Sequence, residues 1–448
     1  MNSSSQTQST STADPRTAEE LAAAEAEYEK FVWDNLPRNY AGHYLHGMLG
    51  MTGFRLFNAP TFFPAYLHSL SGSDAIVGLG LALQQLGSVI SPFFGATIIE
   101  HRKRVLPVAA WIGSGMRLPI LGISAAGWFL SGLPGIQLWT IIACMFVFGI
   151  FSGAQGVAFQ MLLAKVIPIS RRGRLQAWRN VTGGLVAAAL SYVAGRYIIG
   201  GNLFGHGYSV TFFLAFVLTS AGLTALSLLM REPEPPTVRE RSTIRQRFKE
   251  FPTLLTTDPS FRFFILAQVL ASAGAFAQPF YIISVGHQMP IDGNALGLLS
   301  LAFLGADTAT NLGWGYMGDK FGFRSTFIAS LILWAGATVL LIMAHTLPAV
   351  IVAFFCIGAA QSGQQMSSST MVLEFGNRED IAMRLALSQT AQGSMRALGP
   401  LIGGFVAAGL GYNFLFSVSM GFMVAALTVL ILAVKEPRNR RGGAVESA

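Results

Sequence analysis

The chain has 448 residues, of which 52% are hydrophobic and only 12% are charged. Because soluble domains carry ~25% charged residues, a water-soluble fold is excluded and we expect an integral membrane protein. The net charge of +8 does not indicate nucleic-acid binding, since the basic residues lie in the links between apolar segments. Cys144 and Cys356 lie inside apolar segments, which predicts neither a disulfide framework nor a metal site.

The first 40 residues form a tail ahead of the first apolar segment. Residues 1–14 are rich in Ser and Thr, which predicts disorder. Ala, Glu and Leu dominate residues 17–35, with Phe31 and Trp33 near the end. This pattern predicts a cytoplasmic helix whose aromatic end rests at the membrane interface. The acidic start excludes a signal peptide, which needs a basic n-region.

Stretches of ~20 mostly apolar residues are long enough to cross a bilayer. The predicted spans are 42–67, 75–99, 105–130, 137–164, 175–199, 209–230, 262–286, 293–317, 325–345, 348–373, 384–409 and 413–434. We therefore expect an all-α membrane protein of twelve helices. It would comprise an N-terminal six-helix bundle at 41–231, a cytoplasmic link at 232–260, a second six-helix bundle at 261–434 and a cytoplasmic tail at 435–448.

Lys and Arg fall on alternate links between these spans. Basic residues occur at 101–104, 165–174, 231–249, 320–324, 378–384 and 435–441, and on the other side only Arg196 comes near a link. The positive-inside rule then places both termini in the cytoplasm. We expect a multi-pass protein of a bacterial-type inner membrane.

The end of the eighth span and the link that follows it contain Gly315, Asp319, Lys320, Gly322 and Arg324. Glycines let two helix ends approach closely, and an aspartate can cap a helix start or pair with a base. The two bases hold the link on the cytoplasmic side. We expect these five residues to form a conformational loop.

The two halves are related in sequence, which indicates an internal duplication. A shift of 220 residues pairs Leu79, Leu81 and Gly95 with Leu299, Leu301 and Gly315, and a shift of 210 pairs Arg174-Leu175 with Arg384-Leu385.

The loop pattern G-x-x-x-D-K-x-G-x-R, together with the duplication, resembles the major facilitator superfamily of secondary transporters over residues 40–435. The resemblance implies two bundles that rock about a central binding site and expose it alternately to each side. The first-half loop at 95–104 keeps the opening glycine and basic end, but its acid is one residue late. Residues 397–404 are similar to the G-P-x-x-G-G motif of drug antiporters, but they lie in the eleventh span rather than the fifth. This departure counts against drug antiport without excluding it.

Four charged residues lie deep within predicted spans: Arg55, Arg117, Asp307 and Arg396. At ~1.5 Å per helical residue each lies roughly 18 Å from the cytoplasmic boundary, near the middle of a ~30 Å core. A charge at that depth is costly and needs a partner or a purpose. An anionic substrate would balance the three arginines, since guanidinium binds carboxylate or phosphate in a bidentate manner.

The alternative is a structural role, in which Asp307 pairs with Arg396 or Arg55 and backbone carbonyls satisfy Arg117. In the family that the chain resembles, the first, fourth, seventh and tenth spans line the cavity, which favours Arg55 as a substrate contact. Third spans lie at the periphery, which favours a structural Arg117. Asp307 is the candidate for carrying a coupled proton, because a neighbouring arginine that moves would change its affinity for the proton.

Amide side chains mark the fourth and tenth spans. Gln361, Gln364 and Gln365 share one helix face, and Gln155 lies in the fourth span. Gln278 and Tyr281 in the seventh span extend the same polar interior. Since lipid offers amides no partner, we expect these residues and Arg396 to line the substrate cavity, with interhelical hydrogen bonding as the alternative.

The sequence contains no G-x-x-x-x-G-K-[ST] phosphate loop, no H-E-x-x-H, no C-x-x-C and no nucleophile elbow. We therefore expect no enzyme activity, no cofactor and no metal, and a transport process driven by a gradient. The predicted function is symport of a small organic anion with protons across the lipid bilayer. Proton-coupled drug export and a non-transporting sensor of the same fold are the alternatives.

Overall fold

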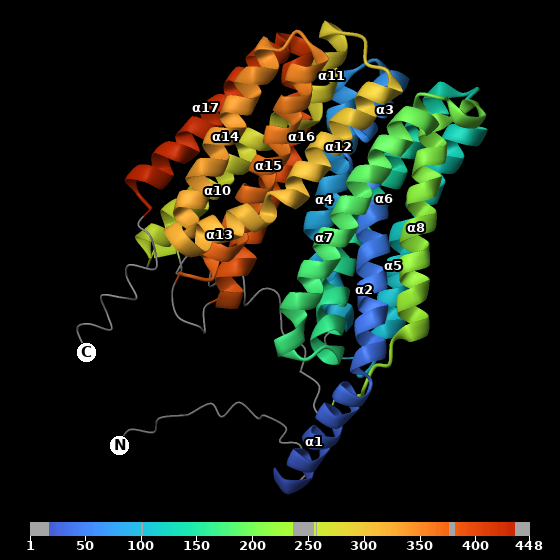
Figure 1. Cartoon of the computed structure of the whole chain (residues 1–448), viewed down its shortest axis with the longest axis vertical. Helices are drawn as coiled ribbons and strands as arrows, with labels where there is room; N and C mark the ends of the chain where they lie inside the picture. The colour runs from blue at the N-terminus through green and yellow to red at the C-terminus, as the bar shows by residue number, and fades with distance from the viewer. Residues whose placement is uncertain (1–17, 100–101, 236–254, 257, 376–380, 435–448) are drawn as a thin grey trace, which may run out of the picture.

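Figure 1 shows the computed structural model of the chain, which describes residues 18–99, 102–235, 255–256, 258–375 and 381–434. In these ranges the chain is helical and contains no β-strand. The helices form two bundles side by side. We call the end where α2 begins and α17 finishes the terminal end, and the opposite end the distal end (Figure 1).

The N-terminal bundle follows a short helix, α1 (Ala18–Asp34), that extends below it at the terminal end (Figure 1). Its helices are α2 (Leu36–Phe57), α3 (Phe62–Ser71), α4 (Asp74–Ile99), α5 (Leu106–Phe129), α6 (Pro134–Val166), α7 (Ile169–Val193) with the π-helical η1 (Ala194–Ile199), the short η2 (Leu203–Gly205) and α8 (Gly207–Leu229).

The C-terminal bundle repeats this arrangement. Its helices are α10 (Pro259–Gly274), the short η3 (Ala275–Ala277), α11 (Gln278–Gln288), α12 (Gly293–Ala309), α13 (Asn311–Phe321), α14 (Phe323–Met343), α15 (Leu347–Val372), α16 (Ile381–Leu410) and α17 (Tyr412–Leu432). Among the described residues, ten segments are long and apolar enough to cross a membrane. The pair α2–α3 and the helix α16 run alongside them, in agreement with the twelve expected spans.

Three spans that the sequence predicts as single helices are broken. The first stops at Phe57 and resumes at Phe62, with Pro60 between. The seventh breaks at η3, just before Pro279, and the eighth breaks at Thr310. Proline removes a backbone donor and clashes with the preceding turn, which explains the first two breaks. Non-helical backbone at membrane depth is tolerated where it is buried in protein or lines a cavity.

The expected conformational loop is shorter than the sequence suggests, because α13 continues through Asp319 and Lys320 to Phe321. Gly322 alone separates α13 from α14, and its φ of 87° lies in the left-handed region that favours glycine. Arg324 donates hydrogen bonds to the carbonyls of Leu430 and Ile431, at 2.9 Å each. A base therefore satisfies the last carbonyls of α17.

The expected helix at 17–35 is confirmed as α1, and Tyr28 fastens it to the bundle by donating to the carbonyl of Lys165 at 2.9 Å. Burial raises the pKa of the Tyr28 hydroxyl, so it remains a donor at neutral pH. The expected disordered tail at 1–14, most of the link at 232–260 and the tail at 435–448 lie outside the described residues.

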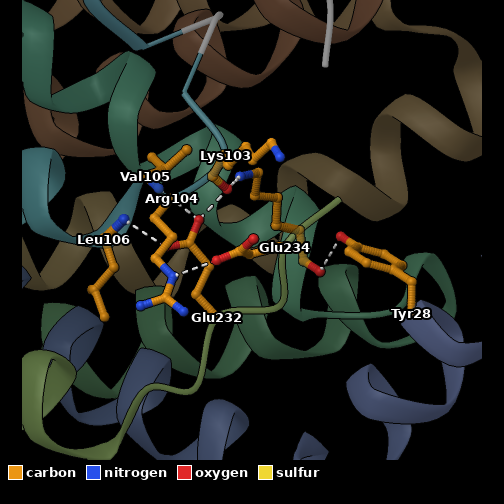
Figure 2. A network of polar contacts seen from close by, with 8 residues as sticks. Tyr28, Lys103, Arg104, Val105, Leu106, Glu232 and Glu234 are labelled. Atoms are coloured by element: carbon orange, nitrogen blue, oxygen red, sulfur yellow. Dashed lines mark hydrogen bonds and ion pairs between the residues drawn. The ribbon is translucent and has the colours of Figure 1, made fainter. Parts of the chain in front are cut away.

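Glu232, the first residue of the expected link, ties three elements together at the terminal end (Figure 2). Its carboxylate accepts from the backbone N–H groups of Val105 and Leu106, at 2.7 and 2.8 Å, where α5 begins. It also pairs with Lys165 at 3.0 Å, and Lys165 donates to the carbonyl of Lys103 at 2.7 Å. An acidic side chain at a helix N-terminus accepts hydrogen bonds from backbone N–H groups that have no partner within the helix. Its negative charge also interacts favourably with the helix dipole.

We predict that Glu232→Ala lowers the free energy of unfolding by about 1–3 kcal/mol, because it leaves the partly buried N–H groups of Val105 and Leu106 without an acceptor and Lys165 without its acidic partner. Glu234→Ala is the matched control. Glu234 also pairs with a base, Arg104 at 3.0 Å, but both side chains are more than half exposed, so its loss costs at most about 1 kcal/mol. Thermal unfolding in detergent measures both variants, and equal losses would contradict the assigned role of Glu232.

Candidate functional site

A cavity of about 350 Å³ lies between the two bundles. The end of α2 and one face of α4 contribute from the N-terminal bundle, and helices α10 to α11, α14, α15 and α16 contribute from the other. Its wall is rich in amide side chains: Asn58, Gln85, Gln278, Gln361, Gln364, Gln365 and Gln392. A second cavity of about 300 Å³ lies in the N-terminal bundle and shares Asn58 and Gln85 with the first.

Arg396 is the one charged side chain among the described residues that line the first cavity. Its Nη2 donates to the side-chain carbonyls of Gln365 and Gln392, at 3.2 Å each. In the described part of the chain nothing else bonds the guanidinium, so its Nη1 and Nε donors remain for a ligand. Arg396 is also solvent-accessible, which an arginine that binds a substrate requires.

A relay of hydrogen bonds fixes the side chain of Gln392. Gln268 donates to the backbone carbonyl of Ser368 at 2.9 Å, so its own carbonyl is left to accept from Ser388 at 2.8 Å. The Ser388 oxygen then accepts from Nε2 of Gln392 at 3.1 Å. This direction leaves the carbonyl of Gln392 facing Arg396. Gln268 and Ser388 are buried and act as positioning residues.

The break in the seventh span supplies a second pair of amides. Gln278 is the first residue of α11, directly after η3, and it donates to the carbonyl of Gln361 on α15 at 2.7 Å. The bond leaves the carbonyl of Gln278 and the amino group of Gln361 at the cavity wall. The pair therefore presents an acceptor and a donor side by side.

Arg55 and Asp307 form an ion pair of 2.9 Å between the two bundles. Arg55 lies in the last turn of α2, and Asp307 lies in the last turn of α12, just before the break at Thr310. Arg55 also donates to the hydroxyl of Thr308 at 2.9 Å. Both charged side chains are largely but not fully buried, at 24% and 17% exposure. The pair thus ties α2 to α12 where neither charge is well solvated.

Further polar contacts join the two bundles between this pair and the distal end. Tyr412 of α17 donates to Asp74 of α4 at 2.7 Å, and Arg196 of η1 donates to Asn294 of α12 at 2.8 Å. Helices α4 and α16 cross closely there, since a Cβ at Gly404 would lie 2.5 Å from the carbonyl oxygen of Asp74. The distal end is therefore closed in this structure, whereas at the terminal end the bundles diverge (Figure 1).

Of the residues expected to bind substrate, the structure brings five to one cavity: Gln278, Gln361, Gln364, Gln365 and Arg396. The other three, Arg55, Gln155 and Tyr281, lie outside its wall. Tyr281 is 1% exposed and bonds Thr338 at 2.9 Å.

Arg117 is buried inside the N-terminal bundle, where it bonds two backbone carbonyls and Gln155. It donates to the carbonyls of Thr219 and Gly113, at 2.7 and 2.6 Å, and to the side chain of Gln155 at 3.3 Å. This is the arrangement that the structural alternative predicts for Arg117.

The sequence interpretation missed Asn58 and Gln85, which bring the N-terminal bundle into the cavity wall. Asn58 follows the last turn of α2 and accepts from Gln84 at 2.8 Å. The Asn-Ala-Pro sequence at 58–60 was the available signal for a helix end, because the residue before a proline disfavours α-helical backbone. Among the described residues, no group of three His, Cys, Asp or Glu side chains is placed to hold a metal.

Comparison with known proteins supports the fold. The family model described as Major Facilitator Superfamily matches residues 45–289 and 264–447. An uncharacterized protein of Mycobacterium tuberculosis is 21% identical over 313 residues, which is 69% of this chain but only 59% of that protein. The multidrug resistance protein MdtG of Klebsiella pneumoniae is 23% identical over 86% of this chain and 92% of its own.

Solved structures agree in fold at low identity. A crystal structure of the nucleoside transporter NupG superposes with a TM-score of 0.70 at 13% identity, covering 89% of this chain and all of that one. A crystal structure of the D-xylose-proton symporter superposes with a TM-score of 0.65 at 14% identity, covering 90% and 98%. At such identities the likeness concerns the fold alone.

We predict that Gly404→Val opens the distal end, because the new side chain meets backbone of α4 that cannot move aside on its own. The readout is the distance between spin labels at Ile169 and Phe321, exposed residues at the terminal ends of α7 and α13, with Cys144 and Cys356 replaced by alanine. The distance should shorten. Gly409→Val in the same helix is the control, since nothing lies within 4 Å of its Cβ position. An unchanged distance in Gly404→Val would contradict the closed-end assignment.

Proposed function

Since the chain belongs to the Major Facilitator Superfamily, whose members are transporters, we propose that it is a secondary transporter that moves a small organic anion together with protons. The observation that carries this proposal is the inter-bundle cavity with Arg396 at its wall. A guanidinium in a polar, partly enclosed site favours a carboxylate or a phosphate as its partner. The anion would bind there in the state open to the terminal end.

The Arg55–Asp307 pair supports a mechanism for coupling. Movement of the bundles that opens the distal end draws α2 away from α12 and separates the two charges. Asp307 then keeps an uncompensated charge in a poorly solvated place, which a proton taken from the distal side neutralises. When the distal end closes again, Arg55 returns as the partner of the carboxylate and the proton leaves toward the terminal side.

This mechanism gives Arg55 a role as the partner of Asp307 rather than as the first contact of the substrate. Thr308 helps to orient Arg55 toward Asp307, because its hydroxyl accepts a hydrogen bond from the same guanidinium nitrogen that pairs with Asp307. We further propose that both termini face the cytoplasm, as the placement of basic residues on alternate links indicates. Protons and anion would then enter the cell together across a bacterial-type inner membrane.

Proton-driven export of drugs is the second candidate, and the similarity to MdtG proteins favours it. A site for amphiphilic drugs would be expected to have a largely apolar wall. Seven amides and an arginine at this wall favour the anion instead. The two candidates differ in an uptake assay, because only the anion carrier accumulates a small hydrophilic acid in proteoliposomes.

We predict that Asp307→Asn abolishes accumulation driven by a pH gradient but leaves exchange of substrate across the membrane intact, because asparagine cannot carry the proton. Uptake into proteoliposomes would be assayed with radiolabelled D-gluconate, succinate, benzoate and glycerol 3-phosphate. Asp292→Asn is the matched control, since Asp292 lies at the distal start of the same helix and caps it through the N–H of Ala295. Gradient-driven accumulation by Asp307→Asn at the wild-type level would refute the coupling role.

We predict that Arg55→Ala and Arg396→Ala fail in different ways. Loss of Arg396 should raise the apparent KM for the anion about tenfold or more, because a charge-assisted bond to the substrate is gone. Loss of Arg55 should impair gradient-driven uptake with a smaller change in KM. Initial rates over a range of substrate concentrations separate the two effects. A larger KM change for Arg55→Ala than for Arg396→Ala would reverse the assignment.

A further inference from the structure

We infer that the ligand of the inter-bundle cavity is a polyhydroxylated monocarboxylate of about six carbon atoms. Arg396 would hold its carboxylate, and the surrounding amides would hold its hydroxyl groups. This inference rests on the proposed function, because it takes the cavity as the transport site, but it names a narrower chemical class than an organic anion.

The single positive charge indicates a single negative charge on the ligand. Arg396 lies at the cavity wall without an acidic partner in the described part of the chain, and it is held only by the neutral carbonyls of Gln365 and Gln392. The relay through Ser388 and Gln268 keeps the carbonyl of Gln392 turned toward it. The guanidinium is thus fixed in place for an anion, yet no second cation is present among the described lining residues for a second negative charge.

The amides indicate a ligand that both donates and accepts hydrogen bonds at many points. Hydroxyl groups do both. The Gln278–Gln361 pair leaves an acceptor and a donor at the wall, and Gln364 of α15 and Gln85 of α4 add further amides, one from each bundle. A hydrocarbon chain in this place would leave these groups without partners, which is costly for a buried polar group.

The size and remaining surface of the cavity set the scale of the ligand. A volume of about 350 Å³ lies at the lower end of the ~300–1,000 Å³ typical of small-molecule sites, which suits one ring or a short chain rather than two linked sugars. Two aromatic residues, Trp334 and Phe276, are among the residues that line it, although both side chains are largely buried. Carbon-bound hydrogens of a sugar-like chain have apolar faces that suit such aromatic contacts.

Binding of three matched six-carbon probes tests the inference. D-gluconate carries both a carboxylate and hydroxyl groups, D-glucitol carries only hydroxyl groups, and hexanoate carries only the carboxylate. Each would be titrated against the full-length protein in lipid nanodiscs by calorimetry at one pH. We expect D-gluconate to bind at least about tenfold more tightly than either of the other two.

Two variants assign the two parts of the ligand. Arg396→Gln should remove the preference for D-gluconate over D-glucitol, because the carboxylate loses its cation. Gln364→Leu, which nearly keeps the volume, should reduce the preference for D-gluconate over hexanoate. Arg396→Lys is the conservative variant and should retain part of the first preference. Size-exclusion profiles and melting temperatures confirm that each variant is folded.

Equal binding of D-glucitol and D-gluconate would overturn the inference, and so would equal binding of hexanoate and D-gluconate or no binding of any probe. These failures differ from failure of the proposed function. If the proteoliposomes accumulate succinate or glycerol 3-phosphate under a pH gradient while D-gluconate does not bind, the transporter assignment stands and the ligand class is wrong. If no anion is accumulated, the proposed function itself fails.

Discussion

The ion pair between Arg55 and Asp307 ties the two bundles together. Charges far from water are expensive unless they are paired, and here the two partners belong to different bundles and meet at 2.9 Å. Each bundle therefore supplies the opposite charge that the charged residue of the other bundle requires. Separation of the bundles costs electrostatic free energy, because it breaks this ion pair. The tight crossing of α4 and α16 and the bond from Tyr412 to Asp74 hold the same side of the molecule closed. A ligand or proton that weakens this ion pair can shift the equilibrium between the closed and the open distal end.

By contrast, the terminal end is organised within each bundle. Glu232 binds the start of α5 and the end of α6, and Arg324 binds the last carbonyls of α17. These contacts lie within one bundle and hold its helix ends together where the two bundles diverge. Bundles that are held together internally suit a rocking motion about the interface between them. The same division explains why Arg396 is accessible while Tyr281, deeper in its own bundle, is not.

The architecture could be predicted from the sequence, because the length of each apolar segment and the positions of Lys and Arg in the links are local features of the sequence. It predicted the span order, the two halves, the helix ahead of the first span and the face shared by Gln361, Gln364 and Gln365. It did not predict the break at Thr310, since no proline marks it. It also left open whether Asp307 pairs with Arg55 or Arg396, because the partner of a buried charge depends on how two bundles are placed together. Gln155 and Tyr281 show a similar limit. A polar side chain in a membrane helix is expected to point toward the protein interior, but the sequence does not show whether it reaches a cavity or a neighbouring helix.

Reversal of the charge pair shows whether Arg55 and Asp307 hold the two bundles together. The spin-label distance across the terminal end would be measured in Arg55→Asp, in Asp307→Arg and in the double variant that carries both changes. We expect each single variant to shorten the distance, because two like charges then face each other between the bundles and open the distal end. The double variant should return the distance toward the wild-type value. If the double variant departs from wild type by the sum of the two single effects, the charges do not hold the bundles together and the account is contradicted.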